Sequence, residues 1–436
     1  MTAFQRKPRV AREKELLEKA ARYLPSGVRG ATFDPEYAMV AESGHGCRIR
    51  DISGNEYIDY LMGSGPLLLG HAHPAVVEAV AKRLDKGSSY LMVNEPAIEL
   101  AEAIVECVPC ADKVCFNSTG SESTFFAMRM ARAFTGREKI LKLEGGYHGT
   151  NDYALMTTQW TREPSTYPTP VADSAGIPRA VLDQVLIAPF NDIETTGALI
   201  EQHHHELAAV ILEPLQRTIP PVAGFLEGLR ELCTHHDIVL IYDEVVTGFR
   251  LALGGAQEYY GVVPDLTALC KGIASGYPIS VLCGRADIMD LADPRRMLKG
   301  DHVRQTGTFS GNSISCTAAL ATLRELRKEG FYASLFAKGR RLMDGLQRSL
   351  EAAGIVAKVT GEPAAFQPWF TDAEVIDFRS TLGADAAMNT RFTELLLQQG
   401  IVKAHEKFFV SAAHDDGAIE TTLAAFESVA VQLAST

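Results

Sequence analysis

Two short apolar runs in the middle of the chain each lead directly into charged side chains. The first run, Ile238–Tyr242, is rich in branched residues, which is typical of a strand buried in a parallel sheet, and it is followed by Asp243 and Glu244. The second run, Leu266–Cys270, leads into Lys271. Because ligands bind at the carboxyl ends of the strands in open α/β sheets, the pattern predicts a crevice that contains an acid and an amine.

Lys271 has two uses open to it at such a position. In the first, the methylene groups of the side chain are buried and the ammonium group lies at the surface. In the second, the amine is desolvated and forms a Schiff base with a carbonyl group. Asp243 precedes Lys271 by 28 residues, about the length of one βαβ unit, so strands that line the same crevice can carry both. That pairing suits pyridoxal 5'-phosphate, for which an Asp keeps the pyridine nitrogen protonated and a Lys carries the aldehyde.

The length and the charge of the chain limit how many domains it can have and which partners it can bind. A chain of 436 residues exceeds one ordinary core and predicts a large and a small domain. The net charge of −12 argues against nucleic acid or an anionic membrane as a partner, because phosphate binding needs a basic surface. Apolar stretches stay short of the ~20 residues that a membrane span needs, and the charged N-terminus does not resemble a signal peptide, so we expect a cytoplasmic protein.

Cysteines and histidines are the residues that would indicate a metal site. The chain has eight cysteines, and Cys107, Cys110 and Cys115 lie close in sequence, but no second pair follows at zinc-site spacing. We therefore expect reduced thiols in the core. Consecutive residues of a helix face different sides, so His203–His205 cannot share one ion and is interpreted as a solvated helix face. The sequence predicts no metal.

The order of the predicted elements divides the chain into domains. Residues 38–61 alternate in the manner of antiparallel strands, and strands then alternate with helices, which is typical of an α/β domain with a mostly parallel sheet. Towards the C-terminus the pattern becomes that of a small α+β domain. We expect an N-terminal helix and meander in residues 1–70, a large domain in 71–324 and a C-terminal small domain in 325–436.

Three loops that follow predicted strands carry candidate binding groups. Residues 117–122 open a helix with small hydroxyl residues and a glycine, which suits a phosphate, although Ser and Thr cap many helices. The loop 144–149 carries Tyr147 and His148 between glycines that let a backbone approach a ligand, although an incidental Tyr-His pair is equally consistent. Glu213 ends another strand and places a carboxylate in the crevice.

Taken together, these stretches resemble one family over nearly the whole chain: the class III pyridoxal-phosphate aminotransferases of fold type I, and within it the glutamate-1-semialdehyde 2,1-aminomutase branch. Each motif is weak alone, but their ordered occurrence is specific. The motifs are STGSE, EGGYHG, LEP, IYDEVVTGFR, LGGAQEYYGVVPDLTALCKG, GTFSGN and SAAH. The resemblance implies an α/β large domain with a mostly parallel central sheet and a small α+β domain formed by both chain ends.

The resemblance also implies roles for individual residues. Lys271 would hold the cofactor as a Schiff base and move the substrate's Cα proton, while Asp243 would face the pyridine nitrogen. Tyr147 and Val245 would cover the two faces of the ring. Thr308 would reach the phosphate of the neighbouring subunit, which implies a homodimer with composite sites. The remaining expected contacts are His148 beside Tyr147, Thr119, Gly120 and Ser121 at the phosphate, and Glu122 and Glu213 as further polar groups.

Departures from the family pattern bear on the substrate. The aminomutase has a Trp in its Gly-Ser-Trp-Gly-Pro segment, where this chain has the shorter Gly63-Ser64-Gly65-Pro66. The loop 158–180 also lacks the small-residue pattern of the aminomutase gate. Arg29 is the expected anchor of a substrate carboxylate, with a surface cation as the plain alternative, and Glu406 matches the family's acid near the C-terminal end.

We therefore rank three functions. The first is a transaminase that moves an amino group between a donor, such as a β-amino acid, an aromatic amino acid or an amine, and a keto-acid acceptor by ping-pong exchange. The second is the intramolecular aminomutase acting on glutamate semialdehyde, which needs no keto-acid partner. The third is a scaffold without activity, which has no use for Lys271, Asp243 and Tyr147 together.

Overall fold

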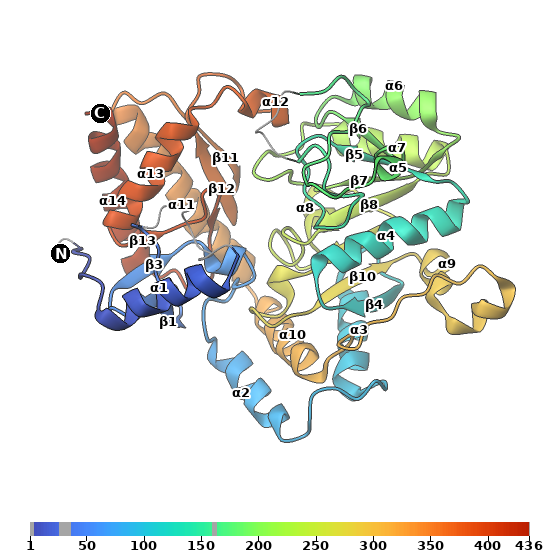
Figure 1. Ribbon diagram of the computed structural model, residues 1–436, viewed down its shortest axis with the longest axis horizontal. Helices are drawn as coiled ribbons and strands as arrows, with labels where there is room; N and C mark the ends of the chain where they lie inside the picture. The colour runs from blue at the N-terminus through green and yellow to red at the C-terminus, as the bar shows by residue number, and fades with distance from the viewer. Residues whose placement is uncertain (1–3, 26–35, 159–163, 436) are drawn as a thin grey trace. The chain divides into compact units, whose positions relative to one another are not determined.

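The computed structural model describes residues 4–25, 36–158 and 164–435 (Figure 1). The contacts divide the chain into two compact units, and each is described by itself. Unit 1 comprises Met1–Pro74, Glu329–Val375 and Gly383–Thr436, and unit 2 comprises Ala75–Lys328 and Ile376–Leu382. Unit 1 is therefore formed by both ends of the chain, while a short segment of the C-terminal part belongs to unit 2.

Unit 2 is built on a sheet that has seven strands among the described residues, in the order β4-β10-β9-β8-β7-β5-β6. The strands are β4 (Lys113–Asn117), β5 (Lys139–Leu143), β6 (Val185–Ala188), β7 (Leu207–Leu212), β8 (Val239–Glu244), β9 (Leu266–Leu269) and β10 (Ser280–Gly284). β10 is antiparallel to both neighbours, whereas the pairs from β9 to β6 are parallel. The predicted α/β fold with a mostly parallel central sheet is confirmed.

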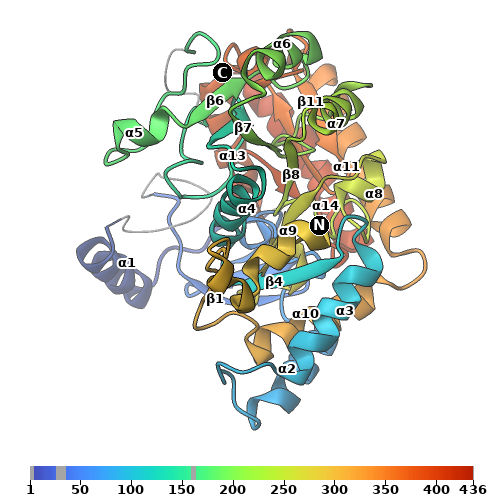
Figure 2. The ribbon, with the colours of Figure 1, turned by 90° about the vertical axis from the view of Figure 1, so that its right-hand side faces the viewer.

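Helices cover this sheet. Every residue of β6 to β9 is buried, because these strands carry apolar side chains on both faces. α4 (Gly120–Thr135) packs across β4 and β7 to β10, where its Met128 joins Ile211 and Ile241 in the core (Figure 2). α6 (Ile193–His203) packs against α7 (Phe225–His235). The other α-helices are α2 (Pro74–Leu84), α3 (Glu95–Cys107), α5 (Arg179–Leu182), α8 (Ala256–Tyr260), α9 (Ala286–Met289), α10 (Ser313–Leu326) and α12 (Phe378–Thr381).

Unit 1 joins the two chain ends through a small sheet. β13 (Ile401–Val402) pairs in parallel with β3 (Glu56–Asp59), which continues antiparallel to β2 (Arg48–Asp51) and β1 (Ala41–His45). Phe366, Phe392, Phe408 and Phe426 form an aromatic core beside it. The other elements are α1 (Ala11–Tyr23), α11 (Phe331–Ala352), β11 (Lys358–Glu362), β12 (Ala365–Trp369), α13 (Ala386–Gln398), β14 (Phe408–Phe409) and α14 (Asp416–Ala434).

Two further observations concern the whole described chain. All eight cysteines lie in the described ranges and are free thiols. Across residues 4–25, 36–158 and 164–435, no helix combines the length and the apolarity that crossing a bilayer requires.

Candidate functional site

The acid and the amine singled out in the sequence come from adjacent strands of unit 2. β8 and β9 run parallel, and Asp243 on β8 pairs with Ala268 on β9. Lys271 follows two residues after Leu269, the last residue of β9. Both charged residues therefore leave the sheet at its carboxyl edge, which is where open α/β sheets bind ligands.

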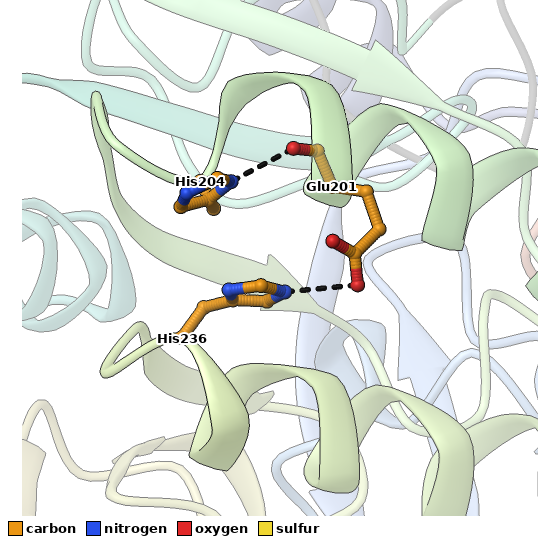
Figure 3. A group of neighbouring side chains, drawn as sticks. All are labelled: Glu201, His204 and His236. Carbon is orange, nitrogen blue, oxygen red and sulfur yellow. Dashed lines mark hydrogen bonds and ion pairs between the residues drawn. The ribbon is translucent and has the colours of Figure 1, made fainter.

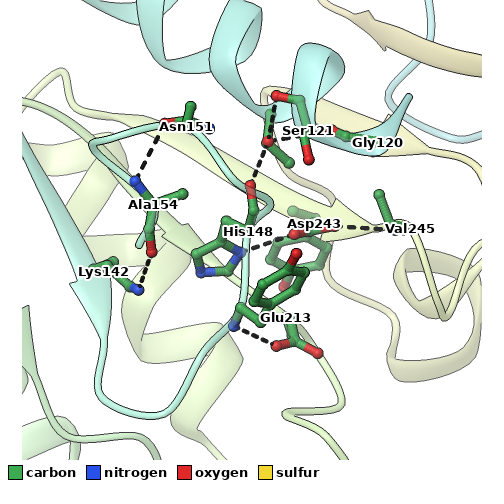
Figure 4. Close-up of polar contacts among 12 residues, drawn as sticks. Gly120, Ser121, Lys142, His148, Asn151, Ala154, Glu213, Asp243 and Val245 are labelled. Atoms are coloured by element: carbon green, nitrogen blue, oxygen red, sulfur yellow. Dashed lines mark hydrogen bonds and ion pairs between the residues drawn. The ribbon is translucent and has the colours of Figure 1, made fainter. Parts of the chain in front are cut away.

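Asp243 is buried and is held by two contacts. Its Oδ2 lies 2.8 Å from Nδ1 of His148, and its Oδ1 accepts the backbone N–H of Val245 at 3.1 Å (Figure 4). His148 is buried as well, and the hydroxyl of Thr124 donates to its carbonyl oxygen at 2.6 Å. Because the imidazole is fixed at both the ring and the backbone, the carboxylate has one defined orientation.

Lys271 lies at the start of a 3₁₀ turn, η2 (Lys271–Ile273), directly after β9. Desolvation lowers the pKa of its amine, and the nearby carboxylates of Glu213 and Asp243 oppose that shift. A lowered pKa leaves a larger fraction of the amine neutral at neutral pH, and only the neutral amine is nucleophilic. The site therefore presents an amine suited to attack a carbonyl carbon.

Glu213 holds the loop that carries Tyr147. Its Oε1 accepts the backbone N–H of Tyr147 at 2.8 Å (Figure 4). The guanidinium of Arg217 lies 5.5 Å from the centre of the Tyr147 ring and also donates to the carbonyl oxygen of Gly145 at 3.2 Å. Tyr147 as a whole is 42% exposed, so its side chain is accessible to a flat ligand.

The N-terminus of α4 has the geometry of an anion site. Thr119 is the N-cap, and its Oγ1 accepts the N–H of Glu122 at 3.3 Å. In return, Oε2 of Glu122 accepts the N–H groups of Thr119 at 2.8 Å and Ser118 at 2.9 Å. This reciprocal cap fixes the first turn, in which Gly120 and Ser121 have no intrahelical acceptor for their N–H groups. Those groups and the helix dipole favour a phosphate.

Gly120 brings this helix end against the strand that carries the acid. A Cβ atom at Gly120 would lie 2.8 Å from Cγ2 of Val245, which is closer than carbon atoms pack. Val245 follows Asp243 by two residues and donates its N–H to the Asp243 carboxylate, so the start of α4, the branched side chain and the buried acid are close neighbours (Figure 4). The close approach explains why only glycine fits at this position.

Three further residues of the predicted site are Thr308, Glu406 and Arg29. Thr308 is exposed, and its carbonyl oxygen accepts the hydroxyl of Ser89 at 3.4 Å. Glu406 belongs to unit 1 and is half-buried. Arg29 lies outside the described residues. Their expected roles stay predictions.

Lys142 is a buried group that the sequence did not indicate. Its Nζ donates to the carbonyl oxygens of Ala154 at 2.8 Å and Met156 at 2.6 Å. Desolvation lowers the pKa of this amine to about 7. A lysine within an apolar strand is normally interpreted as an exposed residue, so no sequence signal distinguishes it.

Glu144 forms a second buried polar cluster, at the start of the Tyr147 loop. Its side chain is 2% exposed, and its Oε2 accepts Nε–H of Arg379 at 2.7 Å and the hydroxyl of Tyr167 at 2.5 Å. The guanidinium of Arg379 also stacks 4.1 Å from the centre of the Tyr167 ring. The segment Ile376–Leu382 is thereby fastened to the loop that precedes Tyr147.

Comparisons with known proteins agree with this geometry. The family model "Aminotransferase class-III" matches residues 31–421. A glutamate-1-semialdehyde 2,1-aminomutase of Methanothermobacter thermautotrophicus is 42% identical over 96% of this chain and 98% of its own. The protein of that name from Methanopyrus kandleri is also 42% identical, over 95% of this chain and 96% of its own.

Solved structures give the same fold. An ω-transaminase from Sphaerobacter thermophilus superposes with a TM-score of 0.92 at 35% identity, with 99% of both chains covered. A glutamate-1-semialdehyde aminomutase from Pseudomonas aeruginosa superposes with a TM-score of 0.85, covering 97% of this chain and 94% of its own. At 23% identity, the second likeness supports the fold alone.

The relatives overturn the ranking of functions made from the sequence. Seven curated relatives, 36–42% identical over 95–96% of this chain, are named glutamate-1-semialdehyde 2,1-aminomutase. The prediction that placed a transaminase first and the aminomutase second is therefore wrong. It relied on the loop 158–180 and on the short Gly63-Ser64-Gly65-Pro66 segment, which forms a tight turn with positive φ at Gly63, Ser64 and Gly65. Because such a turn absorbs a shortened segment locally, the missing Trp is a weak guide to the reaction.

Proposed function

Because this chain belongs to the class-III aminotransferase family, we propose that it is a glutamate-1-semialdehyde 2,1-aminomutase, which moves an amino group from C2 to C1 within one molecule. The observation that carries the proposal is the shared name of seven relatives that align over nearly the whole chain. The chain is an enzyme of this family, and its cofactor is pyridoxal 5'-phosphate. A similar solved structure, a transaminase with this cofactor bound, is 29% identical and has a TM-score of 0.88.

The residues at the carboxyl edge of the sheet fit this cofactor. A buried carboxylate oriented by an imidazole suits a protonated ring nitrogen, an amine of lowered pKa suits an aldehyde, and a capped helix N-terminus suits a phosphate. When bound, pyridoxal phosphate supplies an aldehyde carbon and an electron-withdrawing ring that stabilises negative charge on the substrate carbon.

Each residue of the cluster has a proposed task. Lys271 would hold the cofactor through its amine, and that amine would move a proton at the substrate carbon. Asp243 keeps a proton on the ring nitrogen, and His148 orients the Asp243 carboxylate through its Nδ1. Tyr147 would cover one face of the ring, and Glu213 holds the backbone of Tyr147 in place. Val245 would cover the opposite face.

An isomerisation assay tests the proposed function. The holoenzyme is incubated with glutamate-1-semialdehyde alone, and the product is followed by NMR and mass spectrometry. An aminomutase forms an isomer of unchanged mass without an added amino donor or keto acid. A parallel incubation supplies an amino acid and a keto acid in place of the semialdehyde. Turnover that appears only in this second reaction would refute the proposal.

The proposed assembly is a homodimer in which each subunit completes the other's site. Two neighbouring segments of unit 2 expose apolar side chains, with Leu91 88% and Phe309 62% exposed. The hydrogen bond from Ser89 to the Thr308 carbonyl joins these segments. This exposed apolar patch lies beside Thr308, which is expected to reach the phosphate in a neighbouring subunit. The patch is therefore best explained as an interface with a second copy of the chain.

The assembly is tested by mass and by complementation. Sedimentation equilibrium should give twice the subunit mass, and a variant with both Leu91→Asp and Phe309→Asp should sediment as a monomer. If Thr308 acts across the interface, mixing an inactive Lys271→Ala chain with a Thr308→Asp chain should restore part of the activity. A wild-type chain that sediments as a monomer would contradict the assembly.

A further inference from the structure

Two helices of unit 2 end at a group of histidines that the proposed function does not use. α6 ends at His203 and is followed by His204 and His205, while α7 ends at His235 and is followed by His236. The three consecutive histidines face different sides of the chain and cannot share one ion. Because α6 packs against α7, however, the fold brings one histidine of each helix together.

Glu201, His204 and His236 converge at this point, as Figure 3 shows. The rings of His204 and His236 are stacked, with centroids 4.6 Å apart and planes 24° apart. Nε2 of His236 lies 2.9 Å from Oε1 of Glu201. One ligand atom from each of the three residues lies within 4.8 Å of the others. Two imidazoles and a carboxylate are a donor set that suits divalent transition metals.

The hydrogen bonds of the group prepare it for a metal ion. Nδ1 of His204 donates to the backbone carbonyl of Glu201 at 2.7 Å, which makes Nε2 the nitrogen that carries the lone pair (Figure 3). Histidine ligands of metals commonly make this type of bond to a backbone carbonyl. His236 is held more firmly, since its side chain is 10% exposed. Glu201 is 56% exposed, so its side chain can rotate to reach the ~2.0–2.2 Å of a metal–oxygen bond.

The electrostatics of this corner favour a cation. The C-terminal ends of α6 and α7 both lie here, and helix C-termini carry partial negative charge. Arg137 is a nearby cation, but its Nη1 is bonded to the carbonyl oxygens of Leu207, His236 and Asp237.

The group is separate from the cofactor site. His204 precedes β7, which begins at Leu207, and His236 precedes β8, which begins at Val239. Asp243 lies towards the other end of β8. The histidines therefore lie at the amino edge of the sheet, whereas the cofactor residues lie at its carboxyl edge. An ion at the amino edge acts on the stability of unit 2 and not on the reaction.

We propose that Glu201, His204 and His236 form a binding site for one divalent transition-metal ion of the zinc class. The ion would take two imidazole nitrogens and one carboxylate oxygen, with water completing its coordination. It would join the end of α6 to the end of α7. The proposal does not depend on which reaction the enzyme catalyses, since no residue of the group belongs to the proposed cofactor site.

Titration of the holoenzyme with Zn²⁺ by isothermal calorimetry tests the site. Wild type should bind one ion per subunit saturably, and His204→Ala or His236→Ala should weaken the binding by about 10-fold or more. His205→Ala and His235→Ala are matched controls, because these neighbouring histidines lie outside the group and are exposed. The controls should bind the ion as wild type does.

Thermal unfolding gives a second readout. Zn²⁺ should raise the Tm of wild type and of both controls, and should leave the Tm of a His204→Ala/His236→Ala double variant unchanged. Circular dichroism checks that each variant is folded. The proposal is overturned if wild type binds no ion saturably, if the double variant binds it as wild type does, or if the controls lose binding equally. The last two outcomes would place the ion elsewhere, such as at a thiol.

Discussion

Nδ1 of His148 lies 2.8 Å from Oδ2 of Asp243, and both side chains are buried at the carboxyl edge of the sheet. The two residues are 95 positions apart in sequence, so only the fold brings them together. Nε2 of His148 is buried and has no hydrogen-bond partner among the described residues. The imidazole therefore holds the Asp243 carboxylate in place through Nδ1 alone.

Asp243→Asn should reduce kcat by about 10²–10⁴-fold, because the amide does not stabilise a proton on the ring nitrogen. Steady-state kinetics on the folded holoenzyme measure the effect. Glu244→Gln is the control, because Glu244 is an equally buried acid on the same strand that accepts hydrogen bonds from Ala256, Gln257 and Thr247. That variant should lose stability and keep its turnover. Equal kinetic losses in both would show that Asp243 has no special position at the ring.

Lys271→Ala should abolish covalent attachment of the cofactor as well as turnover. Mass spectrometry after borohydride reduction should find the cofactor on the wild-type chain and not on this variant. Lys142→Met is the matched control, because Lys142 is also a buried lysine of lowered pKa. The control should retain the attached cofactor. Attachment that survives in Lys271→Ala would assign the covalent role to another amine.

The elements of the central sheet were predictable where sequence signals are local. Apolar runs bounded by turns marked β8 and β9, and the small residues before α4 marked its start. β10 was missed, because Ser280–Gly284 returns antiparallel to β9 without an intervening α-helix. The omission matters for the site, since Oγ of Ser280 donates to the carbonyl oxygen of Thr119 at 2.6 Å and so supports the cap of α4.

The buried polar clusters were not predictable, because their partners are distant in sequence. Arg379 and Glu144 are 235 residues apart, and the sequence around either residue does not predict the other as its partner. The pairing of His204 with His236 likewise needs α6 and α7 to be packed together. Local periodicity determines which faces are apolar, whereas tertiary packing determines which charged groups meet.

Lys142→Met should change how stability depends on pH. The pKa of Lys142 is about 7 in the folded protein, against an ordinary value of 10.5. Between these values the unfolded chain binds a proton that the folded chain does not, so the free energy of unfolding rises with pH by ~1.4 kcal/mol per unit. Denaturant unfolding at several pH values should find a slope flatter by about this amount in the variant. Lys139→Met, on the same strand, is the control for lost charge and should keep the wild-type slope.

Arg379→Ala should lower the free energy of unfolding by about 1–3 kcal/mol, because it leaves the buried Glu144 carboxylate without its cation. The lower part of that range allows for the partial exposure of Arg379. Lys82→Ala, which removes an exposed pair with Glu78, should change stability far less, because solvent screens that pair. Denaturant unfolding compares the two. A loss for Arg379→Ala no larger than that of the control would mean that solvent replaces the guanidinium.

Gly120→Ala should weaken cofactor binding by about 10-fold, because the new methyl group would lie 2.8 Å from Cγ2 of Val245 and would displace that side chain or the first turn of α4. Titration of the apoenzyme with pyridoxal phosphate measures the affinity. Gly136→Ala is the matched control at the other end of α4. Gly136 has a φ of 69°, and apart from adjacent backbone no atom of the described residues lies within 4 Å of the position that a Cβ would take, so the change should cost about 1 kcal/mol of stability through backbone strain alone. If both variants bind the cofactor with wild-type affinity, the close approach of Gly120 to Val245 does not shape the phosphate site. In that case the first turn of α4 can shift to make room for a methyl group without harm to cofactor binding.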